Sequence, residues 1–274
     1  MIHKKIVWFA ILITLACAGI IVLSVKEKSI ERIEKPVEKV IYFLPHQDDE
    51  MVLLGSIFQN LEQGKDVYTV MVTDGGKSII HDTVNGVAFC TYHDQYHNPD
   101  EEGYYELSRE DFVRARNDEY FRAMQSIGVS EDHILFANPG GKEGSTELTY
   151  RDSELTQAQA LEVIQTFYHM LGDGTYITLA SEAIESDYPH SDHIAIERAL
   201  KEFNGIQTKL FFADRENPAF VIELSGDAQK AKARALQEYT VWKPEEGKFM
   251  IGGHSILDRL KLWGESKREY MIGN

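Results

Sequence analysis

The sequence predicts an α/β domain with a mostly parallel sheet and helices on both faces, preceded by an N-terminal transmembrane helix. Short apolar runs alternate with amphipathic, helix-like runs from residue 39 onward. Helical runs of roughly 10–16 residues are long enough to serve as crossovers between parallel strands. Before this alternation, residues 6–25 form an uncharged and mostly apolar run.

The run 6–25 has the length of a membrane-spanning helix, because twenty helical residues rise about 30 Å. A cleaved signal peptide usually has a shorter apolar region with a small-residue exit, so a cleaved or lipidated signal is the weaker interpretation. Lys4 and Lys5 precede the run and favour a cytoplasmic N-terminus. We therefore expect a cytoplasmic stub, a membrane anchor, a charged tether and an extracytoplasmic domain, at residues 1–5, 6–25, 26–38 and 39–274.

Within the domain, strand and helix patterns follow one another in order. Runs rich in β-branched and aromatic residues predict strands, and apolar residues spaced three and four apart predict helices. The predicted strands are 40–44, 66–73, 133–137, 175–180 and 209–213. The predicted helices are 50–63, 111–127, 156–171, 190–203 and 228–239.

Composition excludes several classes of partner and site. The chain carries a net charge of −16 and has no basic stripe, so nucleic acid is not an expected partner. Its two cysteines, Cys17 and Cys90, fall in different environments, and no disulfide is expected. Two cysteines are also too few for a thiolate cluster, so a bound metal is expected to rely on His and carboxylate ligands.

Two similar motifs stand where a predicted strand passes into a predicted helix. The first is Pro45-His46-Gln47-Asp48-Asp49-Glu50, and the second is Pro189-His190-Ser191-Asp192-His193. In open α/β sheets, ligands bind beyond the carboxyl ends of the strands, where both motifs are expected to lie. An isolated Asp at such a junction is an ordinary helix cap, but two matched Pro-His-x-Asp segments are hard to explain as caps alone.

The motifs contain the groups that a metal-dependent hydrolase needs. His46, Asp49 and His193 supply three N/O ligands for Zn²⁺ and leave a fourth position for water, although Fe²⁺ or Co²⁺ could also occupy such a set. Asp48 stays beside the metal as a general base for the bound water. His190 is expected to donate a proton or stabilise an oxyanion, and Asp192 to hold the His190 tautomer through a hydrogen bond.

These motifs resemble the two signatures of the LmbE/PIG-L-like zinc-dependent N-deacetylases. The similarity continues in 70–75 and in the Arg116-x-x-Glu119-x-x-x-Ala123 pattern, so it covers about 40–205. The resemblance implies a Rossmann-like fold, removal of acetyl from an N-acetylglucosaminyl group, and the same roles for the ligands, the base and the acid. It further implies that Tyr188 lies near the oxyanion and that Arg116 contacts substrate sugar.

We therefore expect a membrane-anchored, zinc-dependent N-deacetylase of an N-acetylglucosamine-type sugar or glycoconjugate, acting through metal-bound water. Hydrolysis of another non-peptide amide is the alternative within enzymes. A catalytically idle, membrane-tethered carbohydrate-binding domain is the alternative outside them. The long insertion 77–110, rich in Tyr and His, is expected to be a substrate-facing loop above the metal, and a plain solvated surface loop is the other interpretation.

Overall fold

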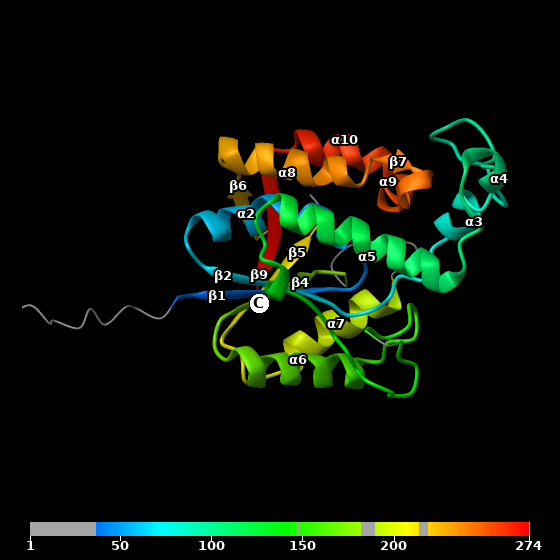
Figure 1. Cartoon of the computed structure of the whole chain (residues 1–274). Helices are drawn as coiled ribbons and strands as arrows, with labels where there is room; N and C mark the ends of the chain where they lie inside the picture. The colour runs from blue at the N-terminus through cyan, green and yellow to red at the C-terminus, as the bar shows by residue number, and fades with distance from the viewer. Residues whose placement is uncertain (1–36, 147, 182–189, 214–218, 274) are drawn as a thin grey trace, which may run out of the picture. The chain divides into compact units, whose positions relative to one another are not determined.

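A seven-stranded sheet lies at the centre of the computed structural model, which describes residues 37–273 apart from 147, 182–189 and 214–218. The strand order is β3-β2-β1-β4-β5-β9-β6 (Figure 1). The strands are β1 (Lys39–Leu44), β2 (Asp66–Met71), β3 (Ile134–Phe136), β4 (Thr175–Leu179), β5 (Thr208–Ala213), β6 (Phe220–Glu223) and β9 (Arg268–Gly273).

Most neighbours in this sheet are parallel, as predicted. Strand β1 pairs in parallel with β2 on one side and with β4 on the other. Strand β9 is the exception, because it runs antiparallel to both β5 and β6. The five strands expected from the sequence all form, and β6 and β9 are two additional strands near the C-terminus.

Helices cover both faces of the sheet, which confirms the predicted layers (Figure 1). One face carries α2 (Leu54–Glu62), α5 (Arg109–Ser126), α8 (Gly226–Glu238) and α10 (Leu257–Glu265), and the other carries α6 (Gln157–Leu171) and α7 (Ser191–Glu202). The alternation along β1 explains this arrangement. Val40, Tyr42 and Leu44 enter the core on the α2 side, whereas Ile41 and Phe43 enter the core on the α6 side.

Local sequence sets where the helices begin. Thr156 forms a capping box with Gln159 at the start of α6, and Ser225 accepts a hydrogen bond from Ala228 at the start of α8. The predicted helix 50–63 divides into a 3₁₀ turn, η1 (Asp49–Val52), and α2. The division places the first motif in a tight turn of its own between β1 and α2.

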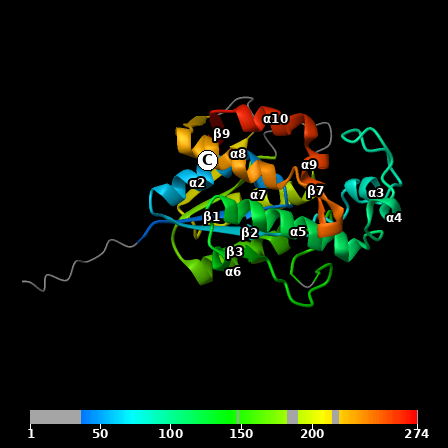
Figure 2. The same ribbon diagram turned by 45° about the horizontal axis from the view of Figure 1, so that its top comes forward.

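The insertion 77–110 shares a small core with α5 and with residues near the C-terminus. Its helices, α3 (Ile80–Val84) and α4 (Pro99–Glu102), lie beyond the end of α5 in both views (Figure 2). Val84 and Tyr104 pack with Phe112 of α5 and with Phe249 and Ile251 near the C-terminus. The remaining elements are η2 (Glu131–His133), β7 (Trp242–Lys243), η3 (Pro244–Glu246), β8 (Lys248–Phe249) and α9 (Ile251–Ser255).

Among the described helices, none has the length and apolar character that crossing a bilayer requires. The predicted anchor at 6–25 lies outside the described residues, and so do the stub 1–5 and nearly all of the tether 26–38.

Candidate functional site

The two motifs meet at the point where the order of the sheet reverses. Strands β2 and β4 flank β1 on opposite sides, so the chain leaves β1 and β4 in different directions. His46 follows β1 directly, and His193 lies in the first turn of α7, which follows β4. This switch point is the general ligand site of open α/β sheets.

The three predicted metal ligands converge there. Asp49 Oδ2 lies 3.3 Å from His46 Nδ1 and 3.1 Å from His193 Nε2. The two ring nitrogens, His193 Nε2 and His46 Nδ1, are 3.1 Å apart. The structure thus brings two imidazole nitrogens and one carboxylate oxygen to a single point, which is a donor set suited to Zn²⁺ and similar cations.

A compact turn orients the first motif. Asp49 Oδ2 accepts a hydrogen bond of 2.8 Å from the backbone N–H of His46, which closes the turn. Asp48 has a φ of 89°, in the left-handed region that a non-glycine residue rarely occupies. Its backbone N–H donates to Glu50 Oε2 at 3.1 Å. A residue held in such a conformation at the edge of a cavity is a candidate for a functional role.

The environment of Asp48 suits a base that works near neutral pH. Burial raises the pKa of its carboxyl to about 6, although the guanidinium of Arg116 acts in the opposite direction. Arg116 Nη2 donates to Asp48 Oδ2 at 3.1 Å. A carboxylate with such a pKa is ionised at pH 7 and still takes up a proton readily.

Arg116 was expected to contact substrate, and the structure gives it a protein-bound position. Besides Asp48, its guanidinium donates to the carbonyl oxygens of Gly75, at 2.5 Å, and of Gln47. The residue is only 5% exposed. It also lines the cavity above the motifs, beside the candidate base Asp48.

Asp192 contacts His190 as predicted, through its backbone, and its carboxylate has a second role. Its carboxylate lies 3.2 Å from His46 Nε2 and accepts backbone N–H bonds from Ser153 and Leu155. The predicted hydrogen bond to His190 comes from the backbone, because the Asp192 N–H donates to His190 Nδ1 at 3.4 Å. The Asp192 carboxylate lies beside His46. It orients His46, so that Nδ1 faces Asp49 and His193.

The carboxylate near His190 is Asp152, which sequence reasoning missed. Asp152 Oδ1 lies 3.5 Å from His190 Nε2 and 3.6 Å from His46 Nε2. Burial opposes ionisation of Asp152, but its hydrogen bonds with His190 and His46 hold its pKa below the ordinary value. The sequence offers little indication of this role, since Asp152 follows a Gly-rich loop and belongs to no recognisable motif.

Negative charge surrounds the His46 ring on two sides. Burial alone would lower the pKa of His46, but its bonds to Asp152, Asp192 and Asp49 raise the pKa well above the ordinary value. Asp49 remains ionised for a related reason. Burial opposes ionisation, but the charge and hydrogen bond of His193 outweigh burial and lower the pKa of Asp49. A site with this excess of carboxylate charge fits a bound divalent cation.

A cavity of about 210 Å³ opens above the convergent side chains. Its lining includes His46, Asp48, His190 and Ser255. A larger cavity of about 620 Å³ shares its lining residues Lys77 and Asp152 with the smaller one, so the two adjoin. The larger cavity is also lined by charged side chains of both signs, from Asp74, Arg109, Glu110, Arg114, Arg151 and Glu154.

The insertion contributes to these cavities only through its two ends. Lys77 and Ser78 line the smaller cavity, and Arg109 and Glu110 the larger one, whereas none of its tyrosines lines either. Tyr104 is buried and donates its hydroxyl to the Val84 carbonyl. The expected stacking surface of tyrosines above the metal ligands is therefore not found in these cavities. Tyr188 lies outside the described residues.

Solved structures share this fold at low sequence identity. The A40926 pseudoaglycone deacetylase Dbv21 aligns with a TM-score of 0.54 and 15% identity, over 87% of this chain and 97% of that one. The N,N'-diacetylchitobiose deacetylase from Pyrococcus horikoshii gives 0.51 and 16%, over 90% and 88% of the two chains. GalB, the 4-carboxy-2-hydroxymuconate hydratase from Pseudomonas putida, gives 0.52 and 12%, over 86% and 95%.

These likenesses establish the fold, and the presence of a hydratase among them shows that the fold alone does not decide the reaction. A search of curated protein sequences finds no match. A family model is more informative, because the one described as "PIG-L: GlcNAc-PI de-N-acetylase" matches residues 41–204. This match covers more than half of the chain and contains both motifs, so the chain belongs to the PIG-L (LmbE-like) family.

Proposed function

We propose that this chain is a zinc-dependent N-deacetylase that hydrolyses the acetamide of an N-acetylglucosamine-type sugar or glycoconjugate. Membership of the PIG-L family supports a metal-dependent deacetylase of the LmbE type. The observation that carries the proposal is the convergence of His46, Asp49 and His193 beside a second carboxylate, Asp48, that is not part of the donor set. Binding a sugar would not require a base beside a metal.

His46, Asp49 and His193 would hold the cation through Nδ1, Oδ2 and Nε2. When bound, a divalent cation supplies a Lewis acid and lowers the pKa of water to about 7. The carboxylate of Asp192 keeps the His46 ring in the orientation that presents Nδ1 to the other two donors.

Asp48 and His190 would divide the proton transfers. As water adds to the acetamide carbonyl carbon, Asp48 takes its proton. The C–N bond then breaks, and the amine leaves with a proton, giving acetate and a free amino sugar. His190, oriented by Asp152, would donate that proton or stabilise the oxyanion. By resemblance, Tyr188 would assist at the oxyanion and Arg116 would lie near the sugar.

The two adjoining cavities support a substrate larger than the reacting sugar. A space of about 210 Å³ is small for a ligand site and suits a single ring. The adjoining space of about 620 Å³ would take the remainder of a glycoconjugate. The neighbour from Pyrococcus horikoshii is a deacetylase of N,N'-diacetylchitobiose, a substrate with a second sugar.

The decisive experiment combines metal analysis with acetate release. The panel would contain N-acetylglucosamine, N,N'-diacetylchitobiose, N-acetylglucosaminyl phosphatidylinositol and simple acetamides. We expect acetate from at least one N-acetylglucosamine compound, and none after His193→Ala, which should also lose the metal of this site. Release from the plain acetamides alone would favour a different amide hydrolase. Sugar binding without acetate release by the metal-loaded protein would favour a carbohydrate-binding domain.

We also propose that the run 6–25 anchors the enzyme in a membrane, with the catalytic domain on the extracytoplasmic side. The support is the length of the apolar run and the position of Lys4 and Lys5 before it. This arrangement would give the enzyme access to lipid-linked or envelope glycoconjugates.

A further inference from the structure

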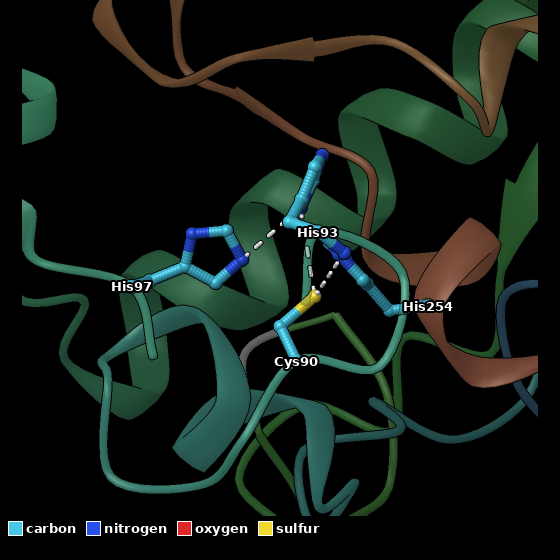
Figure 3. Close-up of side chains that lie close together, drawn as sticks. All are labelled: Cys90, His93, His97 and His254. Carbon is cyan, nitrogen blue, oxygen red and sulfur yellow. Dashed lines mark hydrogen bonds between the residues drawn. The ribbon is translucent and has the colours of Figure 1, made fainter. Parts of the chain in front are cut away.

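A second group of metal-binding side chains lies at the junction between the insertion and the C-terminal part of the chain. Cys90, His93 and His97 come from the insertion, and His254 comes from α9 (Figure 3). One donor atom from each residue lies within 4.8 Å of all the others. Figure 3 shows the four side chains around one small space, with the Cys90 sulfur beside the imidazole rings. None of the four lines the smaller cavity above His46 and Asp48, which we call the catalytic cavity.

Two of the six separations between donor atoms have the length expected in a tetrahedral site. Cys90 Sγ lies 3.5 Å from His93 Nδ1, and His93 Nδ1 lies 3.3 Å from His97 Nε2. Around a tetrahedral Zn²⁺ with ordinary bond lengths, donor atoms stand about 3.3–3.7 Å apart. The backbone N–H of His93 also donates to Cys90 Sγ at 3.3 Å, a contact that stabilises a thiolate.

His254 provides a second and independent observation. Both of its ring nitrogens are buried, and neither has a hydrogen-bond partner among the described residues. A buried imidazole without a well-formed hydrogen bond loses its hydration without full compensation. A ligand bond to a metal ion would satisfy one of these nitrogens.

His97 is held in the orientation of a metal ligand. Its Nδ1 lies 3.0 Å from Glu102 Oε1 and 3.1 Å from Glu102 Oε2, so Nδ1 carries the proton and Nε2 presents its lone pair to the group. The indole of Trp242 stacks on the same ring, with centroids 4.2 Å apart. The backbone at Gly86 packs directly against the backbone of His97. A side chain at Gly86 would overlap the His97 carbonyl oxygen.

We propose that Cys90, His93, His97 and His254 bind a second, structural Zn²⁺ ion that fastens the insertion to α9. The protein supplies all four ligands, so the site is closed and has no position for a reacting water. Binding displaces the thiol proton of Cys90, and the thiolate then forms the metal–sulfur bond. The expectation from the sequence that metal would rely on His and carboxylate ligands overlooked a mixed set, in which one cysteine joins three histidines.

The position of this site links it to the fold of the catalytic region. The three local ligands span only residues 90–97, whereas His254 is far away in the sequence. The residue after His254, Ser255, lines the catalytic cavity. A metal bound to His254 would therefore fix α9 and the insertion at the edge of that cavity.

Metal counting on the full-length protein tests the proposal, and it does not require turnover. With a non-thiol reductant present and excess metal removed, we expect two Zn²⁺ per wild-type chain. We expect one in Cys90→Ala/His254→Ala, one in His193→Ala and none in the combined variant. Two ions in Cys90→Ala/His254→Ala would overturn the proposal, as would a single ion in the wild type that His193→Ala removes.

Cobalt substitution tests the thiolate bond without any risk of misfolding, because it is read on the wild-type protein. Bound Co²⁺ should give a sulfur-to-metal charge-transfer band in the near ultraviolet, since the proposed catalytic ligands contain no sulfur. Cys90→Ser should abolish the band, and the controls Cys17→Ser and His81→Gln should retain it. His81 lies in the same insertion but bonds the Leu107 carbonyl. Absence of the band in a wild-type protein that holds two Co²⁺ ions would refute the site.

The second-site metal and the proposed deacetylase are separable in these experiments. Failure of the deacetylase proposal leaves the charge-transfer band and the count in His193→Ala unchanged. Failure of the structural site leaves acetate release and the catalytic metal in place. We also expect removal of the second ion to lower the melting temperature, since a closed zinc site contributes directly to folding.

Discussion

Adjacent carboxylates in the first motif differ in pKa because their surroundings differ. Asp49 contacts both His193 and His46, and these contacts outweigh burial and lower its pKa. Asp48 is buried beside one guanidinium, and burial prevails, so its pKa rises to about 6. Pairs of titratable groups with diverging pKa values are typical of catalytic sites. Under the proposed function, this difference suits Asp49 to binding a cation and Asp48 to accepting a proton.

This division predicts opposite effects of two matched substitutions. Asp48→Asn should retain the catalytic metal and lose about 10²–10⁴ in rate, the scale of a positioned general base. Asp49→Asn should lose metal, because it replaces a charged oxygen donor by a neutral amide. Metal analysis and acetate release distinguish the two effects. Loss of metal in Asp48→Asn, with retention in Asp49→Asn, would reverse the assignment.

Arg116 should set the pH range of the reaction. The base must be ionised, so kcat/KM should fall as the pH drops below about 6, the raised pKa of Asp48. Arg116→Met removes the positive charge that favours the ionised carboxylate, and the acidic limb should move to higher pH by about one unit or more. Arg268→Met is the control, because Arg268 forms an exposed ion pair with Glu223 on the far edge of the sheet. An unchanged acidic limb in Arg116→Met would show that Arg116 does not tune this base.

Sequence spacing was sufficient to predict which side chains converge, because His46 and Asp49 are three residues apart in one turn. His193 could be added because α7 begins at the same edge of the sheet. Asp152 could not be found in this way. It reaches the site through a loop that returns beside β2, where Thr73 and Tyr150 form an isolated parallel bridge. No local pattern reveals such a contact.

At the scale of elements, the turn after β2 is fitted closely to the site. Gly75 has a φ of +58°, and a Cβ at this position would overlap the Arg116 guanidinium and lie 2.6 Å from Gln47 Oε1. The turn therefore needs glycine both for its backbone conformation and for space. The turn also contributes to the orientation of Asp48, because Arg116 bonds both the Gly75 carbonyl and the Asp48 carboxylate.

Gly75→Ala should consequently cost more stability than a matched glycine substitution. Gly64→Ala is the control, since Gly64 has a φ of +74° with nothing within 4 Å of a new Cβ. We expect the control to lose about 1–2 kcal/mol from backbone strain alone. Gly75→Ala should lose roughly 3 kcal/mol or more and also lower the rate, because Arg116 must move. Denaturant unfolding of both variants provides the comparison, and equal losses would contradict the crowding argument.

Periodicity found the five parallel strands and the helices between them well, because each βα unit from residue 39 to 213 has a clear apolar pattern. It missed β6 and β9. These strands pair antiparallel, so no crossover helix marks them in the sequence. Strand β9 pairs with β5, more than fifty residues earlier in the chain, in antiparallel register. The predicted helix 50–63 was divided because the turn geometry of Asp48 and Asp49 prevails over the helical pattern at its start.

At the scale of the whole molecule, a buried ion pair fastens the C-terminal strand to the helices on one face. Lys232 Nζ of α8 lies 2.9 Å from Glu269 Oε1 of β9. The Glu269 carboxylate also accepts backbone N–H bonds from Gly55 and Ser56 at the start of α2. Through these contacts Glu269 ties α2, α8 and β9 together. Neither residue was singled out from the sequence, because these contacts cross most of the chain.

The arrangement of the chain also predicts how the protein divides between membrane and solution. Residues 37–274 form a compact unit with its own cores, whereas the proposed anchor precedes it. Full-length protein should therefore sediment with membranes and be extracted by detergent. A chain that begins at residue 37 should remain in solution and retain acetate release.

A protease added outside intact cells or protoplasts should then digest the full-length domain without affecting cytosolic markers, because Lys4 and Lys5 favour a cytoplasmic N-terminus. Detergent should not increase this digestion. Replacing Lys4 and Lys5 by Glu removes their positive charge before the apolar run. A fraction of the catalytic domains in this variant should then be protected from the external protease. Complete protection of the wild-type domain in sealed cells, relieved only by detergent, would instead place the catalytic site on the cytoplasmic side.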